Sequence, residues 1–313
     1  MTPIGPVKQN DIKMEEKQLI FIISQPRSGS TYLQSLLSNN HQVNTCSEPW
    51  IILNYISLLK PETVKTDFNM NMASRAFKSY LSNYPEFNFR EKLRSHILEN
   101  YEPMATNFKY VIDKTPRYYG ILGEMLQLFP NSKFIILKRN PIDVARSIMT
   151  TWNIDTIKKI IPYKSDILMA PIIIDNFLRE YSSYSNIYEI SYEKLINNEI
   201  EETKNIYDWL GIDFSSKCID FSSNQKVKGE FGDPYINANL TKDQIENLKP
   251  DLLLWQKKFI LGYGHYLSQT KFSNYSYSYA SRKTATFQYF RYSTKSQNSF
   301  KENFKLNLYK ILS

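Results

Sequence analysis

Cysteine and histidine are scarce in this sequence. Two cysteines, Cys46 and Cys218, are too few for a disulfide framework, which fits a reducing compartment. The three histidines, His41, His96 and His265, are far apart in the sequence and form no convincing metal-ligand cluster. No apolar run approaches the length of about 18 residues that a transmembrane helix needs, and the N-terminal segment lacks a signal-peptide h-region. We therefore expect a cytoplasmic protein that uses no metal.

Glycine is also infrequent, with 9 residues in 313, whereas hydrophobic residues make up 42% and charged residues 22%. This composition is globular, and the length allows one large α/β domain. The net charge of +8 is unevenly distributed, because residues 271–313 carry +7 of it and residues 1–270 only +1. We predict a flexible lead-in over 1–17, a catalytic domain over 18–270 and a basic aromatic extension over 271–313.

The segment 19–37 is predicted to form a buried strand, a polar loop and the start of a helix. Residues 19–23 form a continuous apolar run, and leucines recur at helical spacing after Ser30. A helix that begins there presents unpaired N–H groups and the positive end of its dipole, which together favour an anion. The side chains and backbone of the loop add further donors: Arg27, Ser28, Gly29, Ser30 and Thr31. The sequence therefore predicts a phosphate or sulfate site.

This loop departs from the Walker A pattern G-x-x-x-x-G-K-[ST] at two positions. Ser24 stands at the first glycine and Ser30 at the lysine that reaches the terminal phosphates of a nucleoside triphosphate. The absence of that lysine argues against an ATPase, a GTPase or an ordinary kinase. The run PRSGST instead resembles the 5′-phosphosulfate loop of the sulfotransferase family, whose sulfuryl donor is 3′-phosphoadenosine 5′-phosphosulfate (PAPS).

Further strands and helices alternate along the chain. Strands are expected at 110–114, 134–137 and 186–191, and helices at 119–129, from Pro141 onwards and at 199–210. Residues 60–107 are expected to be partly helical and to cover the substrate side. This alternation predicts an α/β, P-loop-like three-layer fold with a mostly parallel central sheet flanked by helices.

A second strand and helix repeat the logic of the first. Arg139 follows the strand at 134–137, at the sheet end where α/β proteins bind ligands, and a guanidinium grips phosphate in a bidentate manner. The Arg-x7-Ser spacing of Arg139 and Ser147 resembles the 3′-phosphate motif of sulfotransferases. The resemblance also implies that Tyr192 lies near the adenine and that Lys228 and Gly229, in KGEFGD, close over the 3′-phosphate. Val227 replaces the family's usual arginine and Pro234 its usual tryptophan, which puts the strength of that clamp in doubt.

Sulfuryl transfer needs a cation beside the leaving oxygen and a base for the acceptor hydroxyl. Lys114, in DKTP, resembles the K-T-P lysine of carbohydrate sulfotransferases and is expected to stabilise the leaving group. The histidine that cytosolic family members use as base is missing after Lys114. Glu48, in CSEPW, occupies the place of the glutamate base of carbohydrate and protein-tyrosine sulfotransferases. His41 and His265 remain alternative bases, and Glu48 could instead be a charge at a helix N-terminus.

The resemblance implies a PAPS-dependent enzyme that needs no metal and sulfates a hydroxyl of a carbohydrate, a lipid or a secondary metabolite. The basic tail could contact an anionic membrane surface or be a solvated extension, and nothing indicates a nucleic-acid-binding fold. Three alternatives stay open: a phosphotransferase with a degenerate P-loop, a non-catalytic nucleotide-binding module, and a basic-tail adaptor. The sequence does not indicate the oligomeric state.

Overall fold

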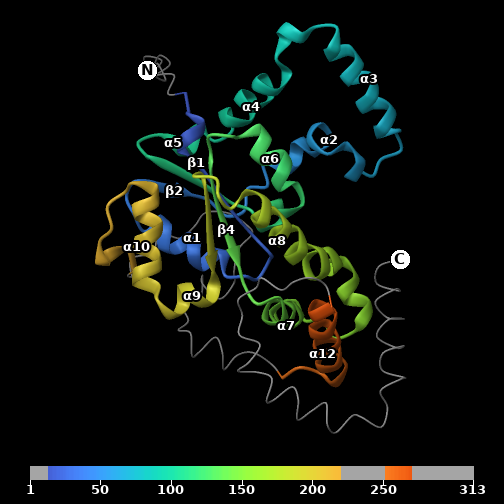
Figure 1. The fold of residues 1–313 in the computed structure, drawn as a ribbon, viewed down its shortest axis with the longest axis vertical. Helices are drawn as coiled ribbons and strands as arrows, with labels where there is room; N and C mark the ends of the chain where they lie inside the picture. The colour runs from blue at the N-terminus through green and yellow to red at the C-terminus, as the bar shows by residue number, and fades with distance from the viewer. Residues whose placement is uncertain (1–12, 220–250, 270–313) are drawn as a thin grey trace, which may run out of the picture.

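The computed structural model describes residues 13–219 and 251–269, and within them the chain forms a five-stranded sheet whose strands are all parallel (Figure 1). The strand order is β2-β3-β1-β4-β5, so β1 is central. The strands are β1 (Leu19–Ser24), β2 (Val43–Thr45), β3 (Tyr110–Lys114), β4 (Lys133–Lys138) and β5 (Ile187–Ser191). The predicted α/β fold with a parallel sheet is confirmed.

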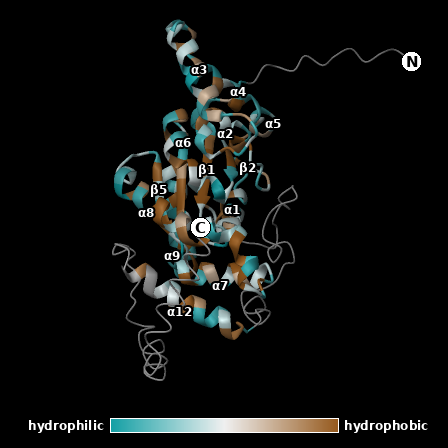
Figure 2. Ribbon diagram, turned by 90° about the vertical axis from the view of Figure 1, so that its right-hand side faces the viewer, coloured by the Kyte–Doolittle hydropathy of each residue, from teal (hydrophilic) through white to brown (hydrophobic). Residues whose placement is uncertain are grey.

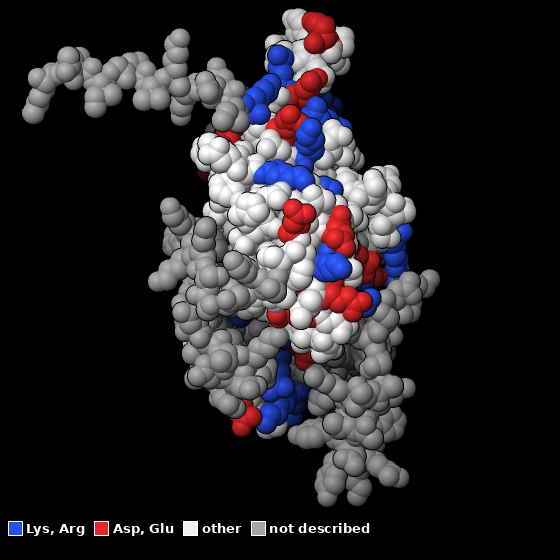
Figure 3. All heavy atoms as spheres, turned by 90° about the vertical axis from the view of Figure 1, so that its left-hand side faces the viewer, with Lys and Arg blue, Asp and Glu red and all other residues white. Residues whose placement is uncertain are grey.

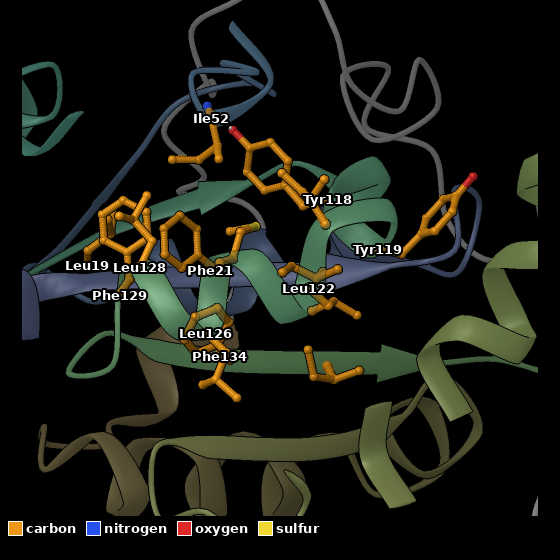
Figure 4. Close-up of a cluster of buried hydrophobic side chains, with 14 of the residues drawn as sticks. Leu19, Phe21, Ile52, Tyr118, Tyr119, Leu122, Leu126, Leu128, Phe129 and Phe134 are labelled. Atoms are coloured by element: carbon orange, nitrogen blue, oxygen red, sulfur yellow. Dashed lines mark hydrogen bonds between the residues drawn. The ribbon is translucent and has the colours of Figure 1, made fainter. Parts of the chain in front are cut away.

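Helices cover both faces of the sheet, because β1 is apolar on both sides. Phe21 faces one side, where it packs with Phe129 and Phe134 at ring-centroid distances of 5.5 and 5.3 Å (Figure 4). The helices on this side are α4 (Phe89–Glu99), α5 (Glu102–Ala105), α6 (Leu122–Leu128) and α8 (Ala170–Tyr181). Ile20 and Ile22 face the other side, which is covered by α1 (Ser30–Ser38), α9 (Tyr192–Asn197) and α10 (Glu199–Leu210). The result is a three-layer structure.

A third apolar cluster joins α7 (Pro141–Thr151) to α12 (Leu254–Gln269), which lie side by side in Figures 1 and 2. Asn140 caps α7 by accepting a hydrogen bond from the N–H of Ile142, as the proline at the first helical position suggested. The hydroxyl of Tyr263 on α12 donates to the carbonyl of Ile167. Since α7 follows the carboxyl end of β4, this cluster borders the sheet edge where the site is expected.

Short helical turns connect these elements. They are the 3₁₀ segments Glu16–Gln18, Ile52–Tyr55, Pro61–Thr63, Pro85–Phe87, Pro116–Ile121, Ile157–Tyr163 and Ser216–Ile219, and a π-helical turn at Ser165–Met169. The helix expected at 119–129 is therefore shorter than predicted, because a 3₁₀ segment that begins at Pro116 occupies its first residues. In the part of the chain that the structure describes, no helix has both the length and the apolar character to span a bilayer.

The prediction that residues 60–107 cover the substrate side is wrong for helix α3 (Met70–Ser82), because this part of the insertion lies far from the carboxyl end of the sheet. After α2 (Ile56–Leu59), Lys60 donates to the carbonyl of Gly120 and pairs with Glu124 on α6. The chain then leaves the body as α3, which contains no buried residue and projects from the end opposite α7 and α12 (Figures 1 and 2). Lys60 thus holds the start of the insertion against α6, and α3 extends away from the carboxyl end of the sheet.

Candidate functional site

The loop between β1 and α1 has a conformation that only glycine tolerates at one position. Gly29 has φ +90°, and a Cβ atom there would lie 2.4 Å from Cδ2 of Tyr192. Arg27 also adopts a left-handed conformation, with φ 67°. Gly29 therefore allows both the backbone turn and the close approach of the Tyr192 ring.

The same loop fits an anionic group. The hydroxyl of Ser28 is fully buried and has no hydrogen-bond partner among the residues that the structure describes, although buried polar atoms are normally paired. Within 13–219 and 251–269, no side chain caps the N-terminus of α1, so the described part of the chain leaves its first N–H groups available. A phosphate or sulfate oxygen would satisfy both kinds of donor, so the loop fits an anionic group, and the roles of Ser28, Ser30 and Thr31 stay predictions.

The structure brings the second motif onto the first. Nη1 of Arg139 donates to the carbonyl oxygen of Arg27 at 3.1 Å, and Nε of Arg27 lies 3.4 Å from Oγ of Ser147. The ring of Tyr192 lies 4.2 Å from the guanidinium carbon of Arg139. Three positively charged or polar groups therefore converge beside the loop, and Tyr192 packs on both Arg139 and Gly29.

Lys114 and Glu48 meet on the other side of the loop. Nζ of Lys114 donates to Oε1 of Glu48 at 2.9 Å and to Oγ1 of Thr31 at 3.3 Å. The Lys114 side chain is completely buried, whereas that of Glu48 is 16% exposed. The indole N–H of Trp50 donates to Oε2 of Glu48 at 3.3 Å, and Trp50 has a left-handed backbone with φ 52°. A bulky residue in that region is strained, as residues at functional sites often are.

The strand order explains why these groups are close together. Strand β1 lies between β3 and β4, so the loop after β1 is flanked by Lys114 at the end of β3 and by Arg139 just after β4. Ligands of open α/β sheets bind at the carboxyl ends of the strands where the strand order reverses, and β1 is that point.

A buried carboxylate next to Lys114 was not anticipated from the sequence. Asp113 is fully buried and accepts hydrogen bonds from the hydroxyls of Tyr101 (2.6 Å), Tyr118 (2.9 Å) and Thr115 (2.7 Å). Burial raises the pKa of Asp113 to about 6, although the three hydroxyls and Lys114 oppose the shift. The Tyr118 hydroxyl also accepts from the backbone N–H of Ile52 at 3.0 Å (Figure 4). Asp113 thus links the end of β3 to the segment that follows Glu48.

A second unanticipated group surrounds Arg117. Its Nε and Nη2 donate to Oδ2 of Asp166 at 3.2 and 2.8 Å, and the hydroxyl of Tyr119 donates to Oδ1 at 2.9 Å. The amide of Gln25 in the loop donates to the backbone carbonyl of Asp166 at 2.7 Å. The only sequence signal was the position of Arg117, three residues after Lys114. Its partner Asp166 is 49 residues away in a segment with no motif.

Some predicted residues are placed away from this centre or are not described. His41 is exposed and precedes β2, at the amino end of the sheet, whereas Lys114 ends β3 at the carboxyl end, so His41 is not positioned to act as the base. Lys228 and Gly229 lie outside the described residues, as does the side chain of His265. The acidic and basic side chains on the described part of one face are interspersed (Figure 3).

Comparison with known proteins identifies the family. A model of the sulfotransferase family matches residues 19–216. The nodulation protein NoeE of Sinorhizobium fredii is 25% identical over 155 residues, which are 50% of this chain and 36% of that protein. An uncharacterized protein of Aquifex aeolicus is 27% identical over 133 residues, 42% of this chain and 17% of that protein. The matched part of the chain therefore spans about a third of the length of one curated relative and about a sixth of the length of the other.

Solved structures are also similar. The sulfotransferase domain of the Synechococcus PCC 7002 olefin synthase has 19% sequence identity and a TM-score of 0.48, over 80% of this chain and 94% of that domain.

Proposed function

Because the chain belongs to the sulfotransferase family, we propose that it transfers a sulfuryl group from PAPS to a hydroxyl of a carbohydrate, a lipid or a secondary metabolite. One observation carries the proposal. The loop at 27–31 lies between two sets of groups, Arg139 and Ser147 on one side and the Lys114–Glu48 pair on the other. This arrangement suits a donor whose anionic group binds at the loop, with its nucleotide towards Arg139 and Ser147 and its reacting sulfur towards Lys114 and Glu48.

The donor would be held by backbone and side-chain donors from two motifs. Ser28, Ser30, Thr31 and the N-terminus of α1 would bind the 5′-phosphosulfate. Arg139 and Ser147 would bind the 3′-phosphate, with Arg27 between the two groups, since it contacts both residues. Tyr192 would support Arg139 and lie near the adenine, and Lys228 and Gly229 would complete the 3′-phosphate site.

The two catalytic roles would fall to Lys114 and Glu48. PAPS supplies the sulfuryl group: the acceptor oxygen forms a new bond to sulfur while the sulfur–oxygen bond to the phosphate breaks, which leaves 3′,5′-bisphosphoadenosine. The Lys114 ammonium, buried and within reach of Thr31, would stabilise the negative charge that develops on the leaving oxygen. Glu48 would accept the proton of the acceptor hydroxyl, and the partial exposure of its carboxylate leaves room for that contact.

Calorimetric titration with 3′,5′-bisphosphoadenosine and, separately, with ATP tests the donor site. We expect binding of the bisphosphate in preference to ATP, and loss of that binding in Arg139→Ala. Arg146→Ala is the matched control, because Arg146 lies on the same helix α7 but is exposed. A preference for ATP would support the alternative of a phosphotransferase with a degenerate P-loop and contradict the proposal.

Transfer of labelled sulfate to an acceptor panel then tests the chemistry. Lys114→Ala and Glu48→Gln should each lower the rate of transfer by about a hundredfold or more while the bisphosphate still binds. If the wild type binds the bisphosphate but transfers sulfate to no acceptor, the chain would be a non-catalytic nucleotide-binding module.

A further inference from the structure

Beside Glu48 lies a group of aromatic and charged side chains to which no role has been assigned. The guanidinium carbon of Arg117 is 5.6 Å from the ring centroid of Trp50 and 5.8 Å from that of Trp152. Trp152 stacks on Tyr163 at 4.4 Å with an angle of 21° between the planes. We define Trp50, Arg117 and Trp152 as the indole–arginine cluster. It is adjacent to the proposed base, because the Trp50 indole donates to Glu48.

Each member of the cluster is held in place and partly accessible. Arg117 is anchored by Asp166, which is 5% exposed, while 32% of the Arg117 side chain remains exposed. Trp152 terminates α7 and is braced by Tyr163, and Trp50 is fixed by its strained backbone and by Glu48. Rigid aromatic surfaces with a few fixed polar groups are typical of small-molecule sites.

The charges of the cluster favour a neutral ligand. Burial lowers the pKa of Arg117, but Asp166 above all, with Tyr119 and Glu48, more than offsets this effect, so the pKa is raised and the guanidinium stays charged. Its charge is balanced by Asp166, and that of Lys114 is balanced by Glu48. An anionic acceptor would therefore meet two cations whose charges are already neutralised.

Hydrogen-bonding capacity remains alongside the aromatic faces. Among the described residues, the hydrogen bonds of the Arg117 guanidinium all go to Oδ2 of Asp166, through Nε and Nη2. The two N–H groups of Nη1 are left to donate to a ligand. A ligand that matches the cluster has an apolar face for an indole ring and hydroxyl oxygens for Nη1. A pyranose ring has both, whereas an alkyl chain offers no such oxygens and a phenol offers one.

We propose that the indole–arginine cluster is the acceptor subsite and that it binds the ring of a neutral sugar, with one hydroxyl directed to Glu48. This inference rests on the proposed function and specifies its acceptor class. Trp50 would then have two roles, because it contacts the sugar ring and holds the second oxygen of Glu48. Neither indole is part of the donor site, so donor binding should not depend on them.

Equilibrium binding to the full-length protein tests the proposal. In the presence of saturating 3′,5′-bisphosphoadenosine, the intrinsic fluorescence is titrated with cellotetraose, chitotetraose, 4-nitrophenol and 1-octanol. We expect a saturable change with at least one of the two sugars, weakened at least tenfold in Trp152→Leu and in Arg117→Gln. Trp209→Phe and Trp255→Phe are the matched controls, because these indoles are also partly exposed but donate to Ser185 and Asp155, away from Glu48. Both controls should bind the sugar as the wild type does.

The outcomes separate this inference from the proposed function. If neither sugar gives a saturable change, or if 4-nitrophenol or 1-octanol binds with the same dependence on Trp152 and Arg117, the sugar assignment is overturned. Calorimetry with the bisphosphate on the same samples reports the donor site independently and shows that each variant is folded. Absence of bisphosphate binding in the wild type would contradict the proposed function itself.

Discussion

At the scale of single residues, Asp113 should make stability depend on pH. Its pKa is 3.8 in an ordinary environment and about 6 in the folded protein, so the folded state holds the proton more tightly. The free energy of unfolding therefore falls as pH rises through this window, by about 3 kcal/mol in total for a shift of this size. Well above pH 6, Asp113 is ionised in both the folded and the unfolded state, so its contribution to the free energy of unfolding no longer depends on pH.

Urea unfolding at about pH 4.5 and about pH 7.5 measures the effect of Asp113. The wild type should lose about 2 kcal/mol more than Asp113→Asn between the two pH values, since the variant cannot titrate at this position. Asp208→Asn, on the exposed side of α10, should behave as the wild type. An unchanged pH dependence in Asp113→Asn would show that another group is responsible.

Gly29 should tolerate no side chain. Gly29→Ala places a Cβ at 2.4 Å from the Tyr192 ring and forces alanine to φ +90°, which we expect to cost about 1–3 kcal/mol of stability and to weaken nucleotide binding. The double variant with Tyr192→Ala should recover only the stability lost to the clash with the ring, since the strain of alanine at φ +90° remains. Gly123→Ala is the control, since its Cβ would meet no atom within 4 Å in helix α6 and should be neutral or stabilising. Thermal unfolding compares the four proteins.

Lys114 should affect turnover more than donor affinity. Lys114→Ala removes the buried ammonium that contacts Glu48 and Thr31, and we expect kcat to fall by about a hundredfold or more, as when an electrostatic donor is lost elsewhere. Steady-state kinetics with varied PAPS separates kcat from KM, and Lys194→Ala, at an exposed position of α9, is the control. A rise in KM with unchanged kcat would mean that Lys114 binds the donor rather than serving the reaction.

At the scale of elements, the local patterns that predicted correctly were complete within a short stretch of sequence. The apolar run of β3 lies between polar neighbours, and α10 ends at Gly211 in a left-handed conformation, as a glycine C-cap requires. By contrast, α8 and α12 were not predicted. Each lies far in sequence from the clusters that it completes, and α8 follows a π-helical turn at Ser165–Met169 that no local pattern indicates.

The site divides in the same way. The proximity of loop 27–31, Arg139 and Lys114 could be predicted because each lies at or just after the end of a strand, and parallel strands bring their carboxyl ends together. Asp113 and the partner of Arg117 could not, because their environment is tertiary: Tyr101 comes from the segment between α4 and α5, and Asp166 comes from beyond α7. The direction of α3 was mispredicted for the same reason, since the start of its segment is held by tertiary contacts such as that of Lys60 with the carbonyl of Gly120.

At the scale of the whole molecule, the charge and the proposed site belong to different parts of the chain. Residues 271–313 carry +7, whereas every described residue of the proposed site lies before residue 193. If the catalytic domain is 18–270, a chain that ends at residue 270 should keep donor binding and lose only what the basic extension contributes.

Thermal unfolding with 3′,5′-bisphosphoadenosine tests this division. A ligand at about 100 times its Kd stabilises the folded state by about 2.7 kcal/mol, which corresponds to a rise in Tm of roughly 5 °C or more for a protein of this size. The full chain and the chain ending at residue 270 should show the same rise, and Arg139→Ala should show none in either. A smaller rise in the shortened chain would place part of the donor site within 271–313, and the domain boundary would then have to move towards the C-terminus.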